Sequence, residues 1–235
     1  NNMGLTLQEM GEYEKAILSC KQALSINSNY ALPYTNMGVS LNHQGKIEAS
    51  IEAYNKSISL NPDYPETHKN LSLALLQTGR IKEGLEKYEW RWKTEGENEK
   101  KLASSKPIWK GENNSRIYIW KEQGIGDEIM FCSILPEIKH LTNNLIINCD
   151  KRLIPLFERS LPKNYIYETH REKIKDDEYD YHIPMGSLRM IFRNDLKSFA
   201  NCLALVSSES IIFLILKILY FLRYPICVAG FNLIF

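Results

Sequence analysis

A glycine turn followed by an acidic residue, Gly124-Ile125-Gly126-Asp127, is the segment of this sequence best suited to chemistry. Glycines can adopt a positive φ and leave room for a ligand against the backbone, and the free amides of a helix start attract anions. The turn could therefore cradle a phosphate, although Ile129 stands where a G-x-G-x-x-G fingerprint needs its third glycine. Asp127 fits two roles, a general base or a helix N-cap. Backbone N–H bonds to a capping carboxylate lower its pKa, so these two roles oppose each other.

The other reactive residue types show no pattern of a known site. The five cysteines are widely spaced and contain no C-x-x-C, which argues against a disulfide framework or a zinc site and favours a reducing, cytoplasmic compartment. The five histidines lack the spacing of metal ligands, so we expect no metal. Ser187 lacks the G-x-S-x-G context of a nucleophile and fits a loop or N-cap position. The net charge of +1 argues against binding of nucleic acid.

Short strands and helices alternate through the second half of the chain. Residues 117–120 form a β-branched and aromatic run directly before the glycine turn, and residues 128–140 show helical spacing of apolar side chains. Further strands are expected at residues 145–149, 165–167 and 179–183, with a helix at residues 153–161. This alternation favours an open parallel sheet, in which ligands bind at the carboxyl ends of the strands. The glycine turn lies at such an end.

The first third of the chain repeats with a period of 34 residues. Residues 2–4 recur as residues 36–38, and Gly45 recurs as Gly79. The period and the pattern of small and large residues resemble the tetratricopeptide repeat, a helix pair that stacks on its neighbours. In the middle copy we expect Gly45 to end the first helix and four residues to pack the two helices together: Gly38, Ser50, Tyr54 and Ser57. The array is expected to offer a concave surface to a peptide or protein partner, or to serve only as a scaffold.

The third copy departs from the pattern at its end. Arg91 stands where the earlier copies have Ala23 and Ser57, and a large charged residue there would block a further repeat. We therefore expect the array to end near residue 93, with three aromatic residues as candidates to dock its last helix on the next domain: Tyr88, Trp90 and Trp92. A solvating helix end is the alternative. The polar residues that follow indicate a linker.

A longer string carries a second resemblance. Residues 121–131, Lys-Glu-Gln-Gly-Ile-Gly-Asp-Glu-Ile-Met-Phe, together with residues 88–92, 107–111, 149–157 and 182–188, resemble tetratricopeptide proteins fused to a glycosyltransferase domain. That domain is similar to the heptosyltransferases of the GT-B fold. The resemblance implies glycosyl transfer from a nucleotide-sugar co-substrate to an acceptor, with no obligatory metal or other cofactor. It implies that Asp127 is the base, and it places five residues at the acceptor cleft: Gln123, Gly124, Gly126, Gly186 and Ser187.

The expected fold class is therefore α + α/β. About three tetratricopeptide repeats, the first of them incomplete, occupy residues 1–93, and a linker occupies residues 94–110. The Rossmann-like half of a GT-B fold occupies residues 111–200, and an apolar tail occupies residues 201–235. A GT-B enzyme needs a second half to hold its donor, and the tail is too short for one. Because transfer requires donor and acceptor in reacting geometry, we expect no turnover by these 235 residues alone. The alternative is a non-enzymatic adaptor in which the repeats bind a protein partner.

The tail is almost wholly apolar after Glu209, the last acidic residue. It fits a buried final helix, a membrane helix, or a non-native tail from a shifted reading frame. Its uninterrupted apolar segments are shorter than the roughly 20 residues that span a bilayer, which argues against a membrane span. The change of composition coincides with the end of the resemblance and favours the non-native tail, so we expect a chain that is incomplete at both ends.

Overall fold

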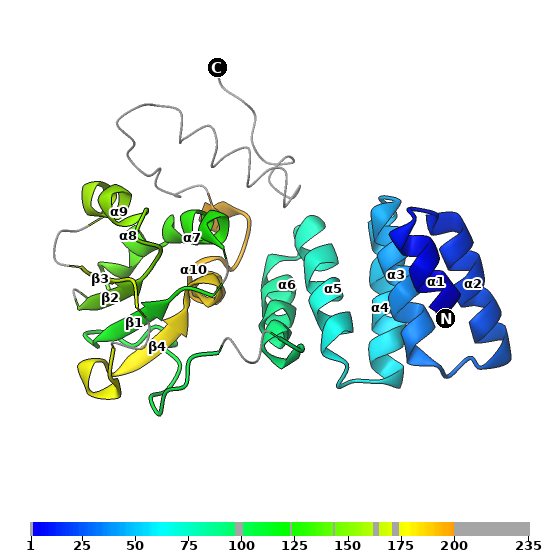
Figure 1. Ribbon diagram of the computed structural model, residues 1–235, viewed down its shortest axis with the longest axis horizontal. Coiled ribbons are helices and arrows are strands. Elements are labelled where there is room, and N and C mark those ends of the chain that lie inside the picture. The colour runs from blue at the N-terminus through cyan, green and yellow to red at the C-terminus, as the bar shows by residue number, and fades with distance from the viewer. Residues whose placement is uncertain are drawn as a thin grey trace, which may run out of the picture. The chain divides into compact units, whose positions relative to one another are not determined.

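The computed structural model describes residues 2–96, 101–122, 124–142, 144–161, 165–170 and 174–199. The chain divides into two compact units, one within residues 1–99 and one within residues 100–235, and each is described by itself. Figure 1 shows helices alone in the first unit and a sheet with helices in the second. The predicted fold class, α + α/β, is confirmed. The predicted apolar tail lies outside the described residues.

The first unit consists of three helix pairs that pack in chain order (Figure 1). Their bounds are α1 Asn2–Glu9, α2 Tyr13–Ile26, α3 Ala31–His43, α4 Ile47–Leu60, α5 Pro65–Gln77 and α6 Ile81–Tyr88. Each helix packs on the next, so the apolar face that one pair cannot bury alone is covered by its neighbour. Of these helices, none combines the length and apolar character that crossing a bilayer requires, nor does any other described helix.

Glycine ends the first helix of all three pairs. Gly11, Gly45 and Gly79 have φ values of 75°, 75° and 78°, in the left-handed region that favours glycine. The residue after each glycine donates its N–H to a carbonyl five positions earlier, as Lys46 does to Leu41 over 2.9 Å. This geometry satisfies carbonyls that the helix end would otherwise leave open. The predicted role of Gly45 is confirmed.

A close approach of two helices depends on Gly38. A Cβ atom built at Gly38 would lie 2.5 Å from the nearest ring carbon of Tyr54, so only glycine lets α3 meet this ring. Ser50 and Ser57 of α4 are fully buried, and the Ser57 hydroxyl lies 2.8 Å from that of Thr35 in α3. Tyr54 joins Ile51 and three apolar residues of α5 in the core of this unit: Leu71, Ala74 and Leu75. The predicted packing of the middle copy is confirmed.

The array ends in a short 3-10 helix, η1 (Glu89–Lys93). Arg91 is buried there: its Nη1 donates to the Tyr88 carbonyl over 3.1 Å and to Glu89 over 2.7 Å, and its guanidinium lies over the rings of Tyr88 and Trp92. The large charged side chain is thus enclosed by the end of its own helix. Trp90 stacks on His68 of α5 with ring centroids 3.7 Å apart, so this ring packs within the repeats. Docking on the next domain stays a prediction.

Four short parallel strands form the sheet of the second unit, in the order β3–β2–β1–β4. Their bounds are β1 Ile117–Trp120, β2 Leu145–Asn148, β3 Ile166–Glu168 and β4 Tyr181–Pro184. The predicted parallel sheet is confirmed. Because β2 and β3 extend the sheet to one side of β1 and β4 lies on the other, the strand order reverses between β1 and β4. In open α/β sheets such a switch point is where ligands bind.

The helices of this unit are shorter than the sequence predicts. They are α7 Ile125–Cys132, α8 Leu135–Ile138, α9 Ile154–Ser160 and α10 Arg189–Phe192, with 3-10 turns η4 Asp176–Glu178, η5 Met185–Leu188 and η6 Lys197–Phe199. The prediction of one helix over residues 128–140 is wrong. Pro136 has no N–H to donate to the carbonyl of Cys132, four residues earlier, and α7 ends at Cys132.

The end of the predicted linker belongs to this unit. His182 of β4 donates its N–H to the Pro107 carbonyl over 3.1 Å, and Trp109 donates its N–H to the His182 carbonyl over 2.9 Å. Trp109 is buried in the core, and Asp176 accepts hydrogen bonds from Ser104 and Ser105. The predicted end of the linker at residue 110 is therefore corrected, because the serine and tryptophan side chains named above already pack in the second unit.

Candidate functional site

The candidate site lies at the carboxyl ends of β1 and β4. Trp120, the last residue of β1, is paired with Pro184, the last residue of β4. The chain continues from β1 through Glu122 into α7, and from β4 into η5, and α7 packs on η5. The glycine turn and the Gly186-Ser187 pair, which are far apart in the sequence, are thereby brought to one end of the sheet. Gln123 lies outside the described residues.

Asp127 is not the cap of α7. The N-cap is Gly124, and Asp127 is the third residue of the helix, where its N–H donates to the Gly124 carbonyl over 2.9 Å. No side-chain hydrogen bond caps this helix, so the N-cap interpretation of Asp127 is wrong. Asp127 is 7% exposed and lies in the first turn, where the helix dipole favours a negative charge.

The two turn glycines leave room beside the backbone but are not strained. Gly124 is extended, with φ −75° and ψ 169°, and neither Gly124 nor Gly126 is among the residues with positive φ. Neither glycine therefore uses its capacity for a positive φ. A Cβ built at either glycine would meet no atom within 4 Å. The space that the sequence suggested for a ligand is present, and a side chain could also occupy it.

Gly186 packs closely against other parts of this unit, and its predicted place at the acceptor cleft stays a prediction. A Cβ atom at Gly186 would overlap the carboxylate of Glu122 and lie 3.1 Å from the ring of Phe131 in α7. The Arg189 Nε donates to the Gly186 carbonyl over 3.1 Å, and its guanidinium lies over the Phe131 ring. The space that a side chain would fill is thus taken by Glu122, which is 8% exposed. At Gly186 the segment after β4 therefore contacts both the segment after β1 and helix α7.

Ser187 is brought to the same end of the sheet but is buried. It lies in η5 and is 4% exposed. Its predicted contact with an acceptor stays a prediction. Ser187 is predicted in a loop or at an N-cap, and it lies within a 3-10 turn whose N-cap is Pro184.

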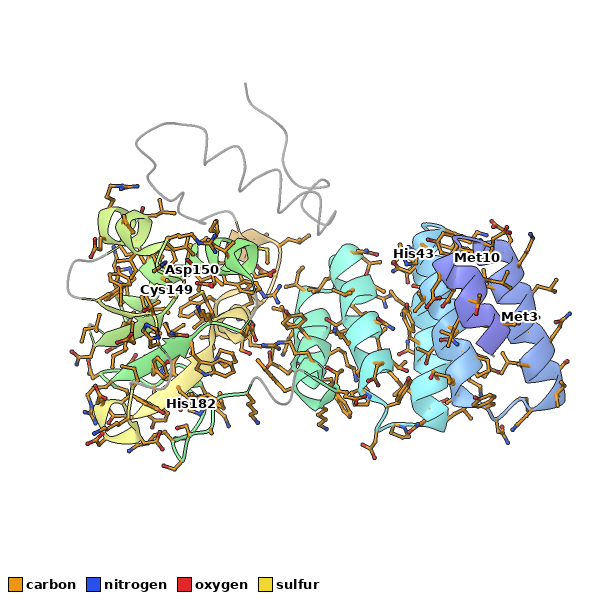
Figure 2. The ribbon with its side chains drawn as sticks, in the orientation of Figure 1. Met3, Met10, His43, Cys149, Asp150 and His182 are labelled. Atoms are coloured by element: carbon orange, nitrogen blue, oxygen red, sulfur yellow. The ribbon has the colours of Figure 1, made fainter. Side chains whose placement is uncertain are left out.

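Glu128, which sequence reasoning passed over, is a second buried carboxylate of α7. Its carboxylate accepts the N–H of Asp150, the second residue after β2, over 2.7 Å. Burial raises its pKa, and the Asp150 N–H bond acts in the opposite direction. The same apolar surroundings and the nearby Glu128 carboxylate raise the pKa of the Cys149 thiol to about 12. Figure 2 labels Cys149 and Asp150 at the end of β2.

Asp127 and Glu128 therefore face different neighbours. Phe131, one turn after Asp127, packs near Gly186, whereas Cys132, one turn after Glu128, lies near Glu128 and Cys149. The Glu128 side of α7 thus contacts the β2 end, and the Asp127 side contacts η5. The signal in the sequence was the Asp-Glu pair itself, because adjacent residues of one helix point in different directions.

Charged residues surround the Glu128 end of the site. Asp150 and Arg152 form a two-bonded ion pair, with both nitrogen–oxygen distances 2.9 Å, and this pair with the Arg152 N–H lowers the pKa of Asp150 below its usual range. Lys121 also acts on Asp150 and Glu128 by its charge. In the parts of the chain that the structure describes, no three His, Cys, Asp or Glu side chains are grouped as metal ligands.

Comparison with known families concerns the first unit. Residues 40–79 match a family model described as "TPR repeat", and residues 1–30 match one described as "Tetratricopeptide repeat". The helix pairs of the first unit are tetratricopeptide repeats. The Caulobacter vibrioides protein FlbA is 42% identical over 60 residues, which are 23% of this chain and 10% of FlbA.

Two solved structures are similar at low TM-scores. MamA matches with a TM-score of 0.37 and 26% identity over 42% of this chain and 57% of its own. A Thermobaculum terrenum O-GlcNAc transferase carrying the K341M substitution matches with a TM-score of 0.37 and 11% identity, over 74% of this chain and 41% of that one. This chain therefore spans about a tenth of FlbA and roughly half of the matched structures' chains.

Proposed function

We propose that the Rossmann-like unit is the acceptor-binding half of a glycosyltransferase and that Asp127 is its base. The observation that carries the proposal is the position of Asp127. Asp127 lies buried in the first turn of α7 at the switch point, close in sequence to two glycines whose Cβ positions are open, and it is not the helix cap. The resemblance to the heptosyltransferases assigns a base to the same residue.

The proposed reaction needs one proton transfer by this unit. Asp127 takes the proton of an acceptor hydroxyl, whose oxygen attacks the anomeric carbon of the sugar while the nucleoside diphosphate leaves. Glu122, Gly186 and Arg189 hold β4 and α7 together around this position. The described residues contain a single sheet, so the donor would be held by residues outside them. The buried free thiols of Cys20, Cys132 and Cys149 support a cytoplasmic site for the reaction.

The test compares transfer by the full-length gene product and its Asp127→Asn variant with a panel of sugar nucleotides. Loss of a general base is expected to lower the rate about 100-fold or more while thermal melting is unchanged. Glu158→Gln, which changes an exposed acid of α9, is the matched control and should retain the wild-type rate. Transfer retained by Asp127→Asn would refute the assignment of Asp127 as the base. Transfer by the 235-residue chain alone would refute the need for a separate donor-binding half.

The repeats support a second function, the binding of a protein partner. Three pairs stack with equivalent turns, and such arrays present extended surfaces. A photoreactive amino acid placed at Leu73 of α5 should then form adducts with another polypeptide in cells, whereas one at Leu18 of α2 should not. The absence of adducts from both positions would contradict protein binding by these helices. If adducts form and no transfer is found, the non-enzymatic adaptor is the better description.

A further inference from the structure

His68 is a buried histidine that connects three parts of the last repeat. It lies on α5, is 3% exposed, and places its Nε2 atom 2.7 Å from the Pro62 carbonyl in the loop before α5. Its ring stacks on that of Trp90 in η1, with centroids 3.7 Å apart and planes inclined by 10°. Because α5 packs on η1, this imidazole is a contact between the loop, α5 and the last turn of the array.

The surroundings of His68 accommodate its neutral form. A carbonyl oxygen only accepts hydrogen bonds, so Nε2 carries the proton and Nδ1 keeps a lone pair. Nδ1 is buried, and no described residue forms a hydrogen bond with it. A proton added to Nδ1 would create a buried donor without an acceptor, on a ring that has become a cation. The packed site therefore opposes the imidazolium.

The second face of the Trp90 ring is occupied by a lysine. The Lys93 Nζ lies 3.6 Å from the centroid of this ring. Two groups so close to one ring must lie on opposite faces, so the indole lies between the ammonium of Lys93 and the imidazole of His68. The attraction of a cation to this indole is thus already provided by Lys93, and a second cation on the other face would be repelled by the first.

Three ionisable groups act on His68: Lys87 of α6, Lys93 of η1 and Asp63 of the loop before α5. Burial lowers the pKa of His68 below its ordinary value, and the two lysines lower this pKa further. The hydrogen bond to the Pro62 carbonyl and the charge of Asp63 act in the opposite direction and are outweighed. Since the ordinary pKa of a histidine is about 6.5, His68 is neutral at pH 7.

We propose that His68 is a proton-sensitive lock between α5 and η1: protonation of its Nδ1 releases Trp90 from the stack and opens the last turn of the repeats. In the released state the imidazolium reaches water, which supplies the hydrogen-bond acceptor that the packed site lacks. The end of the array therefore depends on pH through a single side chain.

The size of the response follows from the difference in proton affinity between the packed and the released ring. The packed ring binds a proton less tightly, so a falling pH favours the released state. Between the ordinary pKa of about 6.5 and the lower pKa of the packed ring, the ratio of released to packed molecules rises by up to about tenfold for each pH unit. Above this range the lock is closed and insensitive to pH.

The test follows Trp90 and η1 in the 235-residue chain labelled with fluorotryptophan. The fluorine NMR resonance of Trp90, assigned by its loss in Trp90→Phe, should shift between pH 7.5 and pH 5 with a midpoint below about 6.5. Hydrogen exchange of residues 89–94, corrected for the intrinsic effect of pH, should become faster by up to about tenfold for each pH unit. His68→Gln can donate an N–H but does not titrate, so it should abolish both responses.

Two further variants separate the lock from a general effect of acid. His43→Gln is the matched control, because His43 ends α3 (Figure 2) and stacks on Tyr13 with ring centroids 4.8 Å apart. This variant should keep the response of Trp90. Lys93→Gln removes a positive charge near His68 and should move the midpoint of the Trp90 resonance to higher pH.

The lock is overturned if the Trp90 resonance and the exchange of residues 89–94 stay unchanged down to pH 5. A response that persists in His68→Gln, or that His43→Gln removes, would overturn it as well. Should His68→Gln fail to fold, Lys93→Gln decides the question. A midpoint that stays in place or moves to lower pH in that variant would refute the role of His68.

Discussion

The two units of the chain are stabilised in different ways. In the repeats, contacts recur: the glycine that ends α1 has counterparts after α3 and α5, and its φ is almost the same in all three. In the Rossmann-like unit the decisive contacts occur once, as where Glu122 fills the space beside Gly186 or Glu128 accepts the Asp150 N–H. A repeated contact can be read from the period of a sequence. A single contact between distant segments requires the fold.

The largest effect is expected from a single contact of the second unit. Arg193, 1% exposed, forms two hydrogen bonds with the Glu137 carboxylate, at 3.0 and 2.6 Å, and so ties the end of α10 to α8. Arg193→Ala should destabilise this unit by about 3 kcal/mol, because it leaves a half-buried carboxylate without its guanidinium. Hydrogen exchange measured by mass spectrometry should show faster exchange in residues 101–199 and unchanged exchange in the repeats. Equal effects on both units would contradict their separate stabilisation.

A smaller effect is expected within the repeats. Gly38→Ala should cost about 2 kcal/mol, since the new Cβ would overlap the Tyr54 ring. Gly45→Ala should cost about 1 kcal/mol, because its Cβ meets no atom and only the positive φ opposes it. Both losses of unfolding free energy can be measured by hydrogen exchange of the amides of the repeats at increasing urea concentrations. An equal cost at the two glycines would show that α3 and α4 can separate to accommodate the methyl group.

The stability of the second unit should depend on pH through Glu128. Because burial raises the pKa of Glu128, the folded state keeps its proton to higher pH than the unfolded chain does. Folding stability should therefore decrease as the pH rises above the ordinary range of a glutamic acid. Glu128→Gln removes this contribution, so its urea midpoint should fall less between pH 4 and pH 7 than that of the wild type. A parallel decrease in both proteins would contradict a raised pKa, and Glu158→Gln controls for the loss of one charge.

The smallest effect is expected at an exposed contact between repeats. Arg80 and Glu48 lie 3.4 Å apart with side chains 43% and 64% exposed. Arg80→Ala should change the stability of the repeats by less than about 0.5 kcal/mol, because water screens such pairs. Urea unfolding at low and high salt measures this contribution. A change of several times that size would mean that repeats are joined by charge as well as by apolar packing.

Sequence reasoning recovered the repeats and the parallel sheet but only part of the site. The 34-residue period identified Gly38 and Gly45, and alternating short elements identified the strands. It misjudged Asp127 as a possible cap, because the phase of a helix start relative to a glycine turn depends on the backbone path after β1. It missed Glu128, whose partner Asp150 lies 22 residues later and is adjacent only through the pairing of β1 with β2.

The pairing of residues 107–109 with β4 has a consequence for the growth of the sheet. Both main-chain groups of His182 are occupied by Pro107 and Trp109, and Pro184 has no N–H to offer. An exposed strand edge invites pairing with another chain, and this edge is closed by a neighbouring segment and a proline. A fifth strand beside β4, in the order of a doubly wound sheet, would first have to displace residues 107–109. The segment that follows the repeats thus decides whether the sheet can be extended beyond β4.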